Sequence, residues 1–208
     1  NINSNASGES TYDLMSDVPT LTDEDTSNFA TLNPLDSTNW LSQNGAFTIT
    51  DGGLTYETDV QGSMNSATIA SNSGKFYYET VVTNYNAMGI RATRAISTGD
   101  VTYRYYANDG TIKYVPYNST SPTTLTTVAT STSGDVIGVA FDLDSNTISW
   151  YKNNSLLYTA TGIVADTYAP CVAAFANQTG ATINFGQRPF AYTPPTGFKK
   201  LNTFNLPD

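Results

Sequence analysis

Two carboxylates at alternate positions, Asp142 and Asp144, come nearest to a catalytic arrangement in this chain. Glycoside hydrolases place two carboxyl groups about 5 to 9 Å apart across the scissile bond, and alternating acidic residues on a strand can supply such a pair. Asp144, however, opens the sequence Asp144-Ser145-Asn146-Thr147, whose residue types favour a turn in which aspartate caps the backbone. We therefore expect both aspartates to be structural.

The composition disfavours other catalytic chemistry. Histidine is absent, which removes the usual general base, the partner of serine and cysteine nucleophiles and the commonest transition-metal ligand. The single cysteine, Cys171, lies in an apolar run and is expected to be a buried hydrophobe. Asp142, Asp144 and Asn146 resemble the start of a calcium loop, but Asn153 replaces the glutamate at the twelfth position and the central glycine is missing. We predict no enzymatic activity, no metal and no cofactor.

The side chains best suited to binding are tyrosines and arginines around the turn Asn108-Asp109-Gly110. Tyrosine offers flat apolar area and a hydroxyl, which suit both sugars and proteins, and arginine could anchor an acidic sugar or pair with aspartate. Strand alternation puts Tyr103 and Tyr105 on one face and Tyr106 on the other. The opposing interpretation is that alternate tyrosines fill a core. The predicted ligand-binding residues are Tyr103, Tyr105, Tyr114, Tyr117, Arg91, Arg94 and Arg104.

The elements that must position these residues are strands. From Trp40 onward, short runs of β-branched and aromatic residues are broken by Gly, Asn, Asp and Ser. The Ser/Thr-rich segment 119–133 is expected to be an exposed loop, and the proline-punctuated tail 187–208 an irregular segment over the sandwich. Strands are predicted at 46–50, 53–58, 64–69, 75–83, 87–91, 101–107, 111–117, 135–142, 147–152, 155–160, 168–175 and 181–185.

The first 36 residues are polar and show neither helical nor strand periodicity over a useful length. We predict an extended N-terminal arm over residues 1–36, preceding a domain over 37–208. The acidic stretch after Thr22 suggests a short helix near 23–30. Scattered apolar residues in the arm could dock on the same chain or on another subunit. Since the chain begins at Asn1, we expect a processed product or part of a longer protein.

The charge balance excludes two classes of partner. A net charge of −9, from 18 acidic and 9 basic residues, repels a phosphate backbone and anionic lipid. No apolar run approaches the length of a membrane-spanning helix. We predict no nucleic-acid binding and no membrane insertion.

Three segments, in order, resemble SPRY domains. They are the strand Gly74-Lys75-Phe76-Tyr77-Tyr78-Glu79, the hairpin over 134–154, and Tyr168 and Pro170 followed by the closing strand 181–190. Asn154 replaces the glycine that the family usually has after Lys-Asn, although asparagine also tolerates a left-handed backbone. The resemblance covers about residues 40–198. It implies an all-β fold, a SPRY-like antiparallel β-sandwich of the jelly-roll or concanavalin-like type, used for binding.

Residues 18–21, 29–35 and 189–198 look like the SPRY-containing structural proteins of tailed bacteriophages, where such domains occur on tail fibres and appendages. This resemblance implies a non-enzymatic binding module on the virion, the extracellular particle surface, that recognises a host-surface glycan or protein. The arm would contact other virion proteins, and homo-oligomer formation is left open. The alternatives are a virion decoration, cement or assembly module and a polysaccharide depolymerase.

Overall fold

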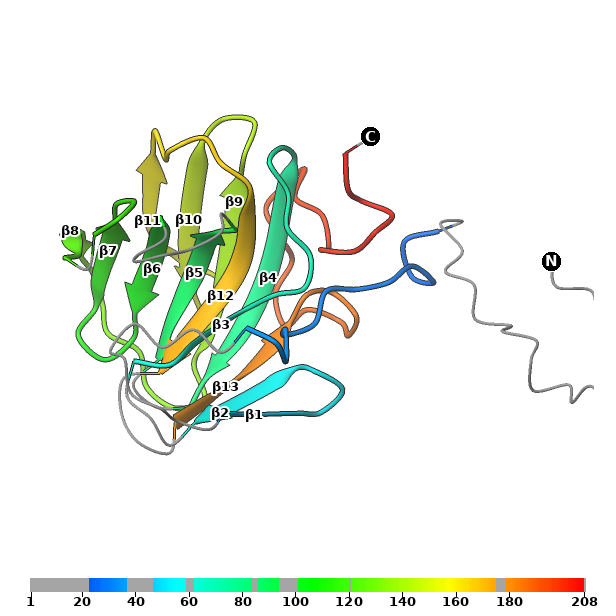
Figure 1. The fold of residues 1–208 in the computed structure, drawn as a ribbon, viewed down its shortest axis with the longest axis horizontal. Helices are drawn as coiled ribbons and strands as arrows, with labels where there is room; N and C mark the ends of the chain where they lie inside the picture. The colour runs from blue at the N-terminus through cyan, green and yellow to red at the C-terminus, as the bar shows by residue number, and fades with distance from the viewer. Residues whose placement is uncertain are drawn as a thin grey trace, which may run out of the picture.

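The protein is a sandwich of two antiparallel β-sheets (Figure 1). The computed structural model describes residues 23–36, 47–58, 62–83, 86–93, 101–119, 121–174 and 179–207. The seven-stranded sheet has the order β1 (Phe47–Thr50), β2 (Thr55–Thr58), β13 (Thr179–Asn184), β4 (Lys75–Val82), β9 (Val136–Asp142), β10 (Thr147–Lys152) and β11 (Ser155–Thr161). The six-stranded sheet has the order β3 (Met64–Ser66), β12 (Tyr168–Ala174), β5 (Asn86–Ala92), β6 (Thr102–Tyr106), β7 (Thr111–Val115) and β8 (Thr123–Thr127).

The two hairpins over 136–161 form as the sequence predicts. β9 pairs with β10 in a register that sets Asp142 opposite Thr147, and β10 pairs with β11. Asn153 and Asn154 adopt left-handed φ values of 46° and 69°, the conformation that a two-residue hairpin turn requires at both central positions. Asparagine at these positions therefore makes the tight turn without glycine.

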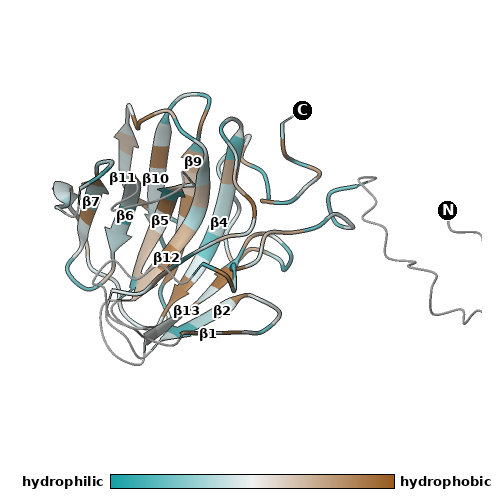
Figure 2. Ribbon diagram, in the orientation of Figure 1, coloured by the Kyte–Doolittle hydropathy of each residue, from teal (hydrophilic) through white to brown (hydrophobic). Residues whose placement is uncertain are grey.

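Large side chains from both sheets fill the space between them, and Figure 2 shows apolar colour concentrated on strands such as β10, β12 and β13. Two polar contacts cross this core. Trp150 on β10 donates its indole N–H to the carbonyl of Met88 at 3.0 Å, and Tyr78 on β4 donates its hydroxyl to the carbonyl of Gly89 at 2.7 Å. Both acceptors lie on β5, so the seven-stranded sheet is hydrogen-bonded to a central strand of the other sheet.

Two local predictions are wrong. The Ser/Thr-rich segment contains strand β8, because β-branched threonine suits an exposed edge strand that pairs on one side with β7. No helix forms at 23–30. There the Asp23 carboxylate accepts the backbone N–H groups of Asp25 and Thr26 at 2.9 and 2.8 Å and closes a turn, and Phe29 then pairs with Asn202. The described part of the chain contains no helix that is long and apolar enough to cross a membrane.

The described end of the predicted arm packs against the sandwich. Ala30 donates its N–H to the carbonyl of Leu201 at 3.0 Å, and Leu32 pairs with Ala67 and is buried in the main core. Residues 1–22 lie outside the described residues, so the extended arm and its boundary at residue 36 stay predictions. Residues 29–33 dock on the same chain, which is one of the two modes expected for the arm.

The C-terminal tail is irregular and lies on the seven-stranded sheet, as expected. Lys199 exchanges backbone hydrogen bonds with β4, donating to Lys75 at 3.0 Å and accepting from Tyr77 at 2.9 Å. The ring of Phe190 packs edge-on against that of Tyr77 with 5.0 Å between centroids. The buried Glu79 carboxylate accepts the N–H groups of Ala191 and Tyr192 at 2.7 and 2.9 Å. Glu79 thus joins the tail to β4 through buried hydrogen bonds.

Candidate binding site

The predicted tyrosines do not form one surface. Tyr103 and Tyr105 lie on the inner face of β6 and belong to the main core, whereas Tyr106 points to the opposite face, as alternation predicts. Tyr105 has no exposed surface, and its hydroxyl donates to the carbonyl of Ala129 at 2.8 Å. Its burial raises the pKa of the phenol. A side chain with no exposed surface cannot contact a ligand directly, so Tyr105 is part of the core and is not retained as a contact residue.

Tyr103 is also part of the interior. Its ring stacks on that of Tyr114 at 4.8 Å, and its hydroxyl accepts the N–H of Val164 at 3.0 Å. Tyr114 is half-buried, and Tyr117, which follows the end of β7, is exposed. Tyr103 therefore does not form the surface itself, but its hydroxyl holds the backbone of Val164 in place.

The predicted arginines are also separated. Arg104 is buried on the outer face of the six-stranded sheet, with its guanidinium 5.4 Å from the centroid of the Tyr106 ring. Arg94 lies outside the described residues. Arg91, at the end of β5, is the predicted residue that lines a pocket.

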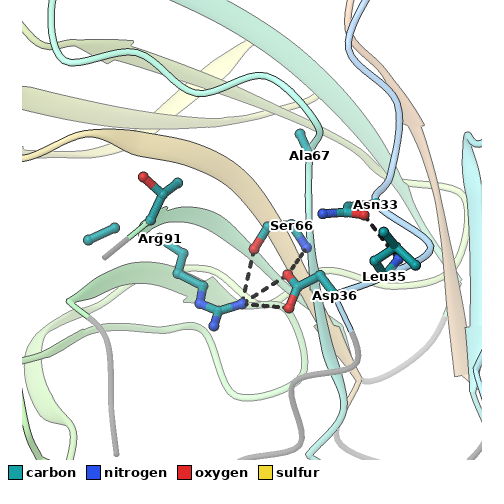
Figure 3. A pocket seen from close by; sticks show the side chains of 8 residues that line it. Asn33, Leu35, Asp36, Ser66, Ala67 and Arg91 are labelled. Atoms are coloured by element: carbon teal, nitrogen blue, oxygen red, sulfur yellow. Dashed lines mark hydrogen bonds and ion pairs between the residues drawn. The ribbon is translucent and has the colours of Figure 1, made fainter. Parts of the chain in front are cut away.

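This pocket has a volume of about 300 Å³ and lies where residues 33–36 meet β3 and β5 (Figure 3). One wall is the chain segment that precedes the sandwich, and the other walls come from the ends of strands. We call it the Arg91 pocket. It is lined by Asn33, Leu35, Asp36, Ser66, Ala67, Arg91, Ala92 and Thr93.

Residues 31–33 extend the six-stranded sheet beyond β3 and so carry the next residues to the pocket. Thr68 donates its N–H to the carbonyl of Thr31 at 2.7 Å, and Asn33 donates to the carbonyl of Ser66 at 3.0 Å. The chain then turns, because Asp36 donates its N–H to the carbonyl of Asn33 at 3.1 Å and the Asn33 side chain accepts the N–H of Leu35 at 3.0 Å. Asparagine followed by proline favours this kind of turn.

Buried polar side chains hold the turn from below. The amide of Asn65, which has no exposed surface, donates to the carbonyls of Asn33 and Asp36 at 2.7 and 2.8 Å. Arg91, only 4% exposed, donates through one guanidinium nitrogen to both carboxylate oxygens of Asp36 at 3.1 and 2.9 Å. Ser66 adds its backbone N–H to the same carboxylate at 2.9 Å. The turn is therefore fixed at both ends.

Leu35 stands at the rim of the pocket and is 89% exposed. A large apolar side chain on a rigid turn is pre-organised for contact, since little conformational freedom is lost when a partner covers it. Of the residues that line the pocket, Arg91 was predicted from the sequence, whereas Leu35, Asp36 and Ser66 were not. The dipeptide Asn33-Pro34 was the available signal, because it marks a turn.

The aspartates considered for catalysis are structural. Asp142 forms an ion pair with Lys75 at 2.9 Å and accepts the N–H groups of Asp144 and Ser145 at 3.1 and 3.0 Å. Burial favours its neutral form, but the hydrogen bonds from Lys75 and Ser145 outweigh burial, so the pKa of Asp142 lies below its usual value. A general acid needs the opposite shift. Among the described residues, no group of three His, Cys, Asp or Glu side chains could hold a metal ion.

Comparison with solved structures gives the same architecture. The SPRY domain of human HERC1 superposes with a TM-score of 0.59 at 18% identity, covering 76% of this chain and 99% of that one. The PSpry domain of TRIM65 gives 0.54 at 14% identity, covering 76% and 93%. The stonustoxin structure gives 0.51 at 18% identity, covering 75% of this chain and 27% of that one. At these identities the likeness concerns the fold.

The family model described as SPRY domain matches residues 75–188, more than half of the chain. No curated protein matches the chain. SPRY domains are generally non-catalytic modules for protein–protein interaction. The matched region contains most strands of both sheets, together with Arg91 of the pocket. The chain belongs to the SPRY domain family.

Proposed function

We propose that this protein is a non-enzymatic binding module that recognises another protein through the Arg91 pocket and the exposed Leu35 beside it. The observation that carries the proposal is the fixed turn of residues 33–36, which presents Leu35 next to a hollow of about 300 Å³. An apolar side chain of the partner would enter the hollow and cover Leu35. Interfaces commonly depend on a few such central contacts.

The setting that we propose is the surface of a phage virion, with a host-surface protein as the partner. The resemblance of residues 18–21, 29–35 and 189–198 to phage structural proteins supports this setting, as does a surface chemistry dominated by Ser, Thr and Asn, with only 13% charged residues. Antibodies against the chain should label the outside of intact particles. Absence from purified particles would contradict the setting and leave the binding site unaffected.

A host-surface glycan is the less favoured ligand. Sugar recognition was expected to use the rings of Tyr103 and Tyr105, and both rings lie within the core. If a partner is instead another virion protein, the same pocket would serve assembly, which is the decoration or cement alternative. A glycan array that stays silent while a protein partner binds would support the proposal.

Peptide selection tests the pocket directly. Peptides selected from a random display library against the purified chain should bind wild-type protein, and Leu35→Asp should weaken that binding by about tenfold or more, since a covered leucine contributes strongly to affinity. Leu156→Asp is the matched control, because Leu156 is also an exposed leucine but lies on β11. Calorimetric titration measures both. Equal binding by the two variants would overturn the proposed site.

A further inference from the structure

A second surface of the molecule lies where the two sheets end at β8 and β11. Strands β8 and β11 are the last strands of their sheets, and no described strand pairs with their outer sides. Figure 1 shows β7, β8 and β11 on the same side of the sandwich. The edge of β3, by contrast, is covered by residues 31–33 of the same chain. We call the surface formed by residues 114–119, 121–134 and 153–165 the β8–β11 flank.

The β8–β11 flank contains no charged residue, although the chain as a whole carries a net charge of −9. Among the charged residues that border it, Asp166 accepts the backbone N–H of Thr167 at 2.8 Å, and two lysines form ion pairs with aspartates. Lys113 lies 3.6 Å from Asp109, and Lys152 lies 3.0 Å from Asp135. This flank is therefore electrostatically neutral in an acidic protein.

The flank is also where apolar side chains reach the surface. Seven large apolar side chains are exposed among the described residues, and four of them belong to it: Tyr117, Leu125, Leu156 and Val164. Leu156 is 57% exposed and Val164 41%. Four half-buried side chains that pack on the main core come from the same two segments: Tyr114, Val128, Leu157 and Tyr158. The core thus extends to the surface at this side.

The exposed apolar residues are held in place. The backbone of Val164 is fixed by two core tyrosines, since its N–H donates to the Tyr103 hydroxyl at 3.0 Å and its carbonyl accepts the Tyr168 hydroxyl at 2.7 Å. Lys152 donates to the carbonyl of Thr130 at 2.8 Å and so links the two segments. A pre-organised apolar surface loses little entropy when it is covered.

We propose that the β8–β11 flank is the interface through which two copies of this protein associate as a symmetric dimer. Two copies with a charge of −9 each repel one another wherever carboxylates face each other, and this flank avoids that repulsion. A basic partner would instead be drawn to the acidic parts of the surface. A neutral apolar surface on an acidic protein therefore fits a second copy best, and a twofold axis pairs the same surface on both.

The contact is made through side chains and not by extension of a sheet. The pairing of β7 with β8 skips Leu125, and the pairing of β10 with β11 skips Leu157, so both edge strands carry a bulge. Bulges twist an edge strand and oppose the addition of a further strand. The four exposed apolar side chains are left to make the contact.

Analytical ultracentrifugation of the full chain tests the dimer over protein concentrations from about 1 μM to about 1 mM, a range that spans weak and moderate self-association. We expect a monomer–dimer equilibrium that strengthens as salt rises, because salt screens the repulsion between the two acidic copies. Leu156→Asp should weaken association by about tenfold or more, since it buries a carboxylate in each half of the interface. Val164→Asp should act in the same direction.

Leu35→Asp is the control, because it introduces the same charge at an exposed leucine outside the flank. It should leave the dimer unchanged, and melting curves of all variants check that they fold. Amide exchange should slow at residues 155–164 as concentration rises. A monomer throughout the concentration range, association that weakens with salt, or equal effects of Leu156→Asp and Leu35→Asp would each overturn the proposal.

Discussion

At the scale of single residues, the partner of each buried charge decides its role. Arg91 was expected either to bind an acidic ligand or to pair with an aspartate, and it pairs with Asp36. The buried Glu79 carboxylate accepts hydrogen bonds from the Tyr77 hydroxyl and from two backbone N–H groups of the tail. A buried charge left without its partner is costly, so these pairs can be tested by removing one side.

Replacing Arg91 by methionine should lower the free energy of unfolding by about 3 kcal/mol, because Asp36 would keep a largely buried charge without its main counter-ion. Arg188→Met is the matched control, since Arg188 and Asp51 form an ion pair whose side chains are 50% and 42% exposed. An exposed pair contributes about 1 kcal/mol or less. Urea denaturation measures both. Equal losses for the two variants would contradict the role assigned to Arg91.

Replacing Glu79 by alanine should release the tail from the seven-stranded sheet, because the N–H groups of Ala191 and Tyr192 lose their acceptor. We expect faster amide exchange at residues 190–192 and a loss of about 2 kcal/mol or more in unfolding free energy. Glu57→Ala, at an exposed position on β2, should change neither. Unchanged exchange at 191 and 192 in Glu79→Ala would show that the tail is held by other contacts.

At the scale of elements, β5 is the strand on which the two sheets depend. It pairs with β12 and β6 within its own sheet, and its carbonyls at Met88 and Gly89 accept the side chains of Trp150 and Tyr78 from the other sheet. Edge strands have the opposite character, since β8 and β11 carry bulges and pair on one side. Substitutions in β5 should therefore affect the whole fold, whereas substitutions on the edges affect association.

Gly89→Ala tests the close approach of β5 and β6. A methyl group at this position would overlap the carbonyl oxygen of Tyr103 and lie 3.0 Å from the Cα of Arg104, so the two strands would have to separate. We expect a loss of about 3 kcal/mol or more in unfolding free energy, the range of severe overpacking. Gly52→Ala, which meets no atom within 4 Å but has a φ of 66°, should cost about 1 kcal/mol. Thermal melting of both variants measures these two losses of stability.

At the scale of the whole molecule, acidity and the absence of histidine set the response to pH. No side chain has an ordinary pKa between about 5 and 8, because histidine is the residue that titrates there. The hydrogen bond from the backbone N–H of Thr132, with the ion pair to Lys152, holds the pKa of Asp135 well below its usual value. The pKa of Asp142 is also lowered.

Carboxyl groups with lowered pKa values in the folded state stabilise it above the pKa of the unfolded chain, about 4, and that contribution is lost as pH falls further. We expect the urea midpoint to stay level from about pH 6 to pH 8 and to fall below about pH 4. Asp135→Asn should lower stability at neutral pH and reduce the acid-dependent loss, whereas Glu57→Gln should do neither. A midpoint that changes sharply near neutral pH would contradict this account.

The sequence by itself determined the sandwich, its main hairpins and the absence of histidine chemistry. The period of two, the Asn153-Asn154 turn and the spacing of aromatic residues are local signals, because each depends on the conformation of a few neighbouring residues. They were sufficient to indicate an all-β domain and to place Tyr103 and Tyr105 on one face. They were not sufficient to separate a weak edge strand from a loop, as at β8, where pairing with β7 supplies the stability.

Only the tertiary structure decided which face of each strand is covered and which distant residues meet. Arg91 contacts Asp36 across 55 positions of the chain, and Glu79 contacts Ala191 across 112. No local pattern records such pairings, since they depend on how the whole chain closes around its core. For the same reason, Tyr103 and Tyr105, which suggested a ligand surface, belong to the interior, while Leu35 and the apolar side chains of the β8–β11 flank are exposed.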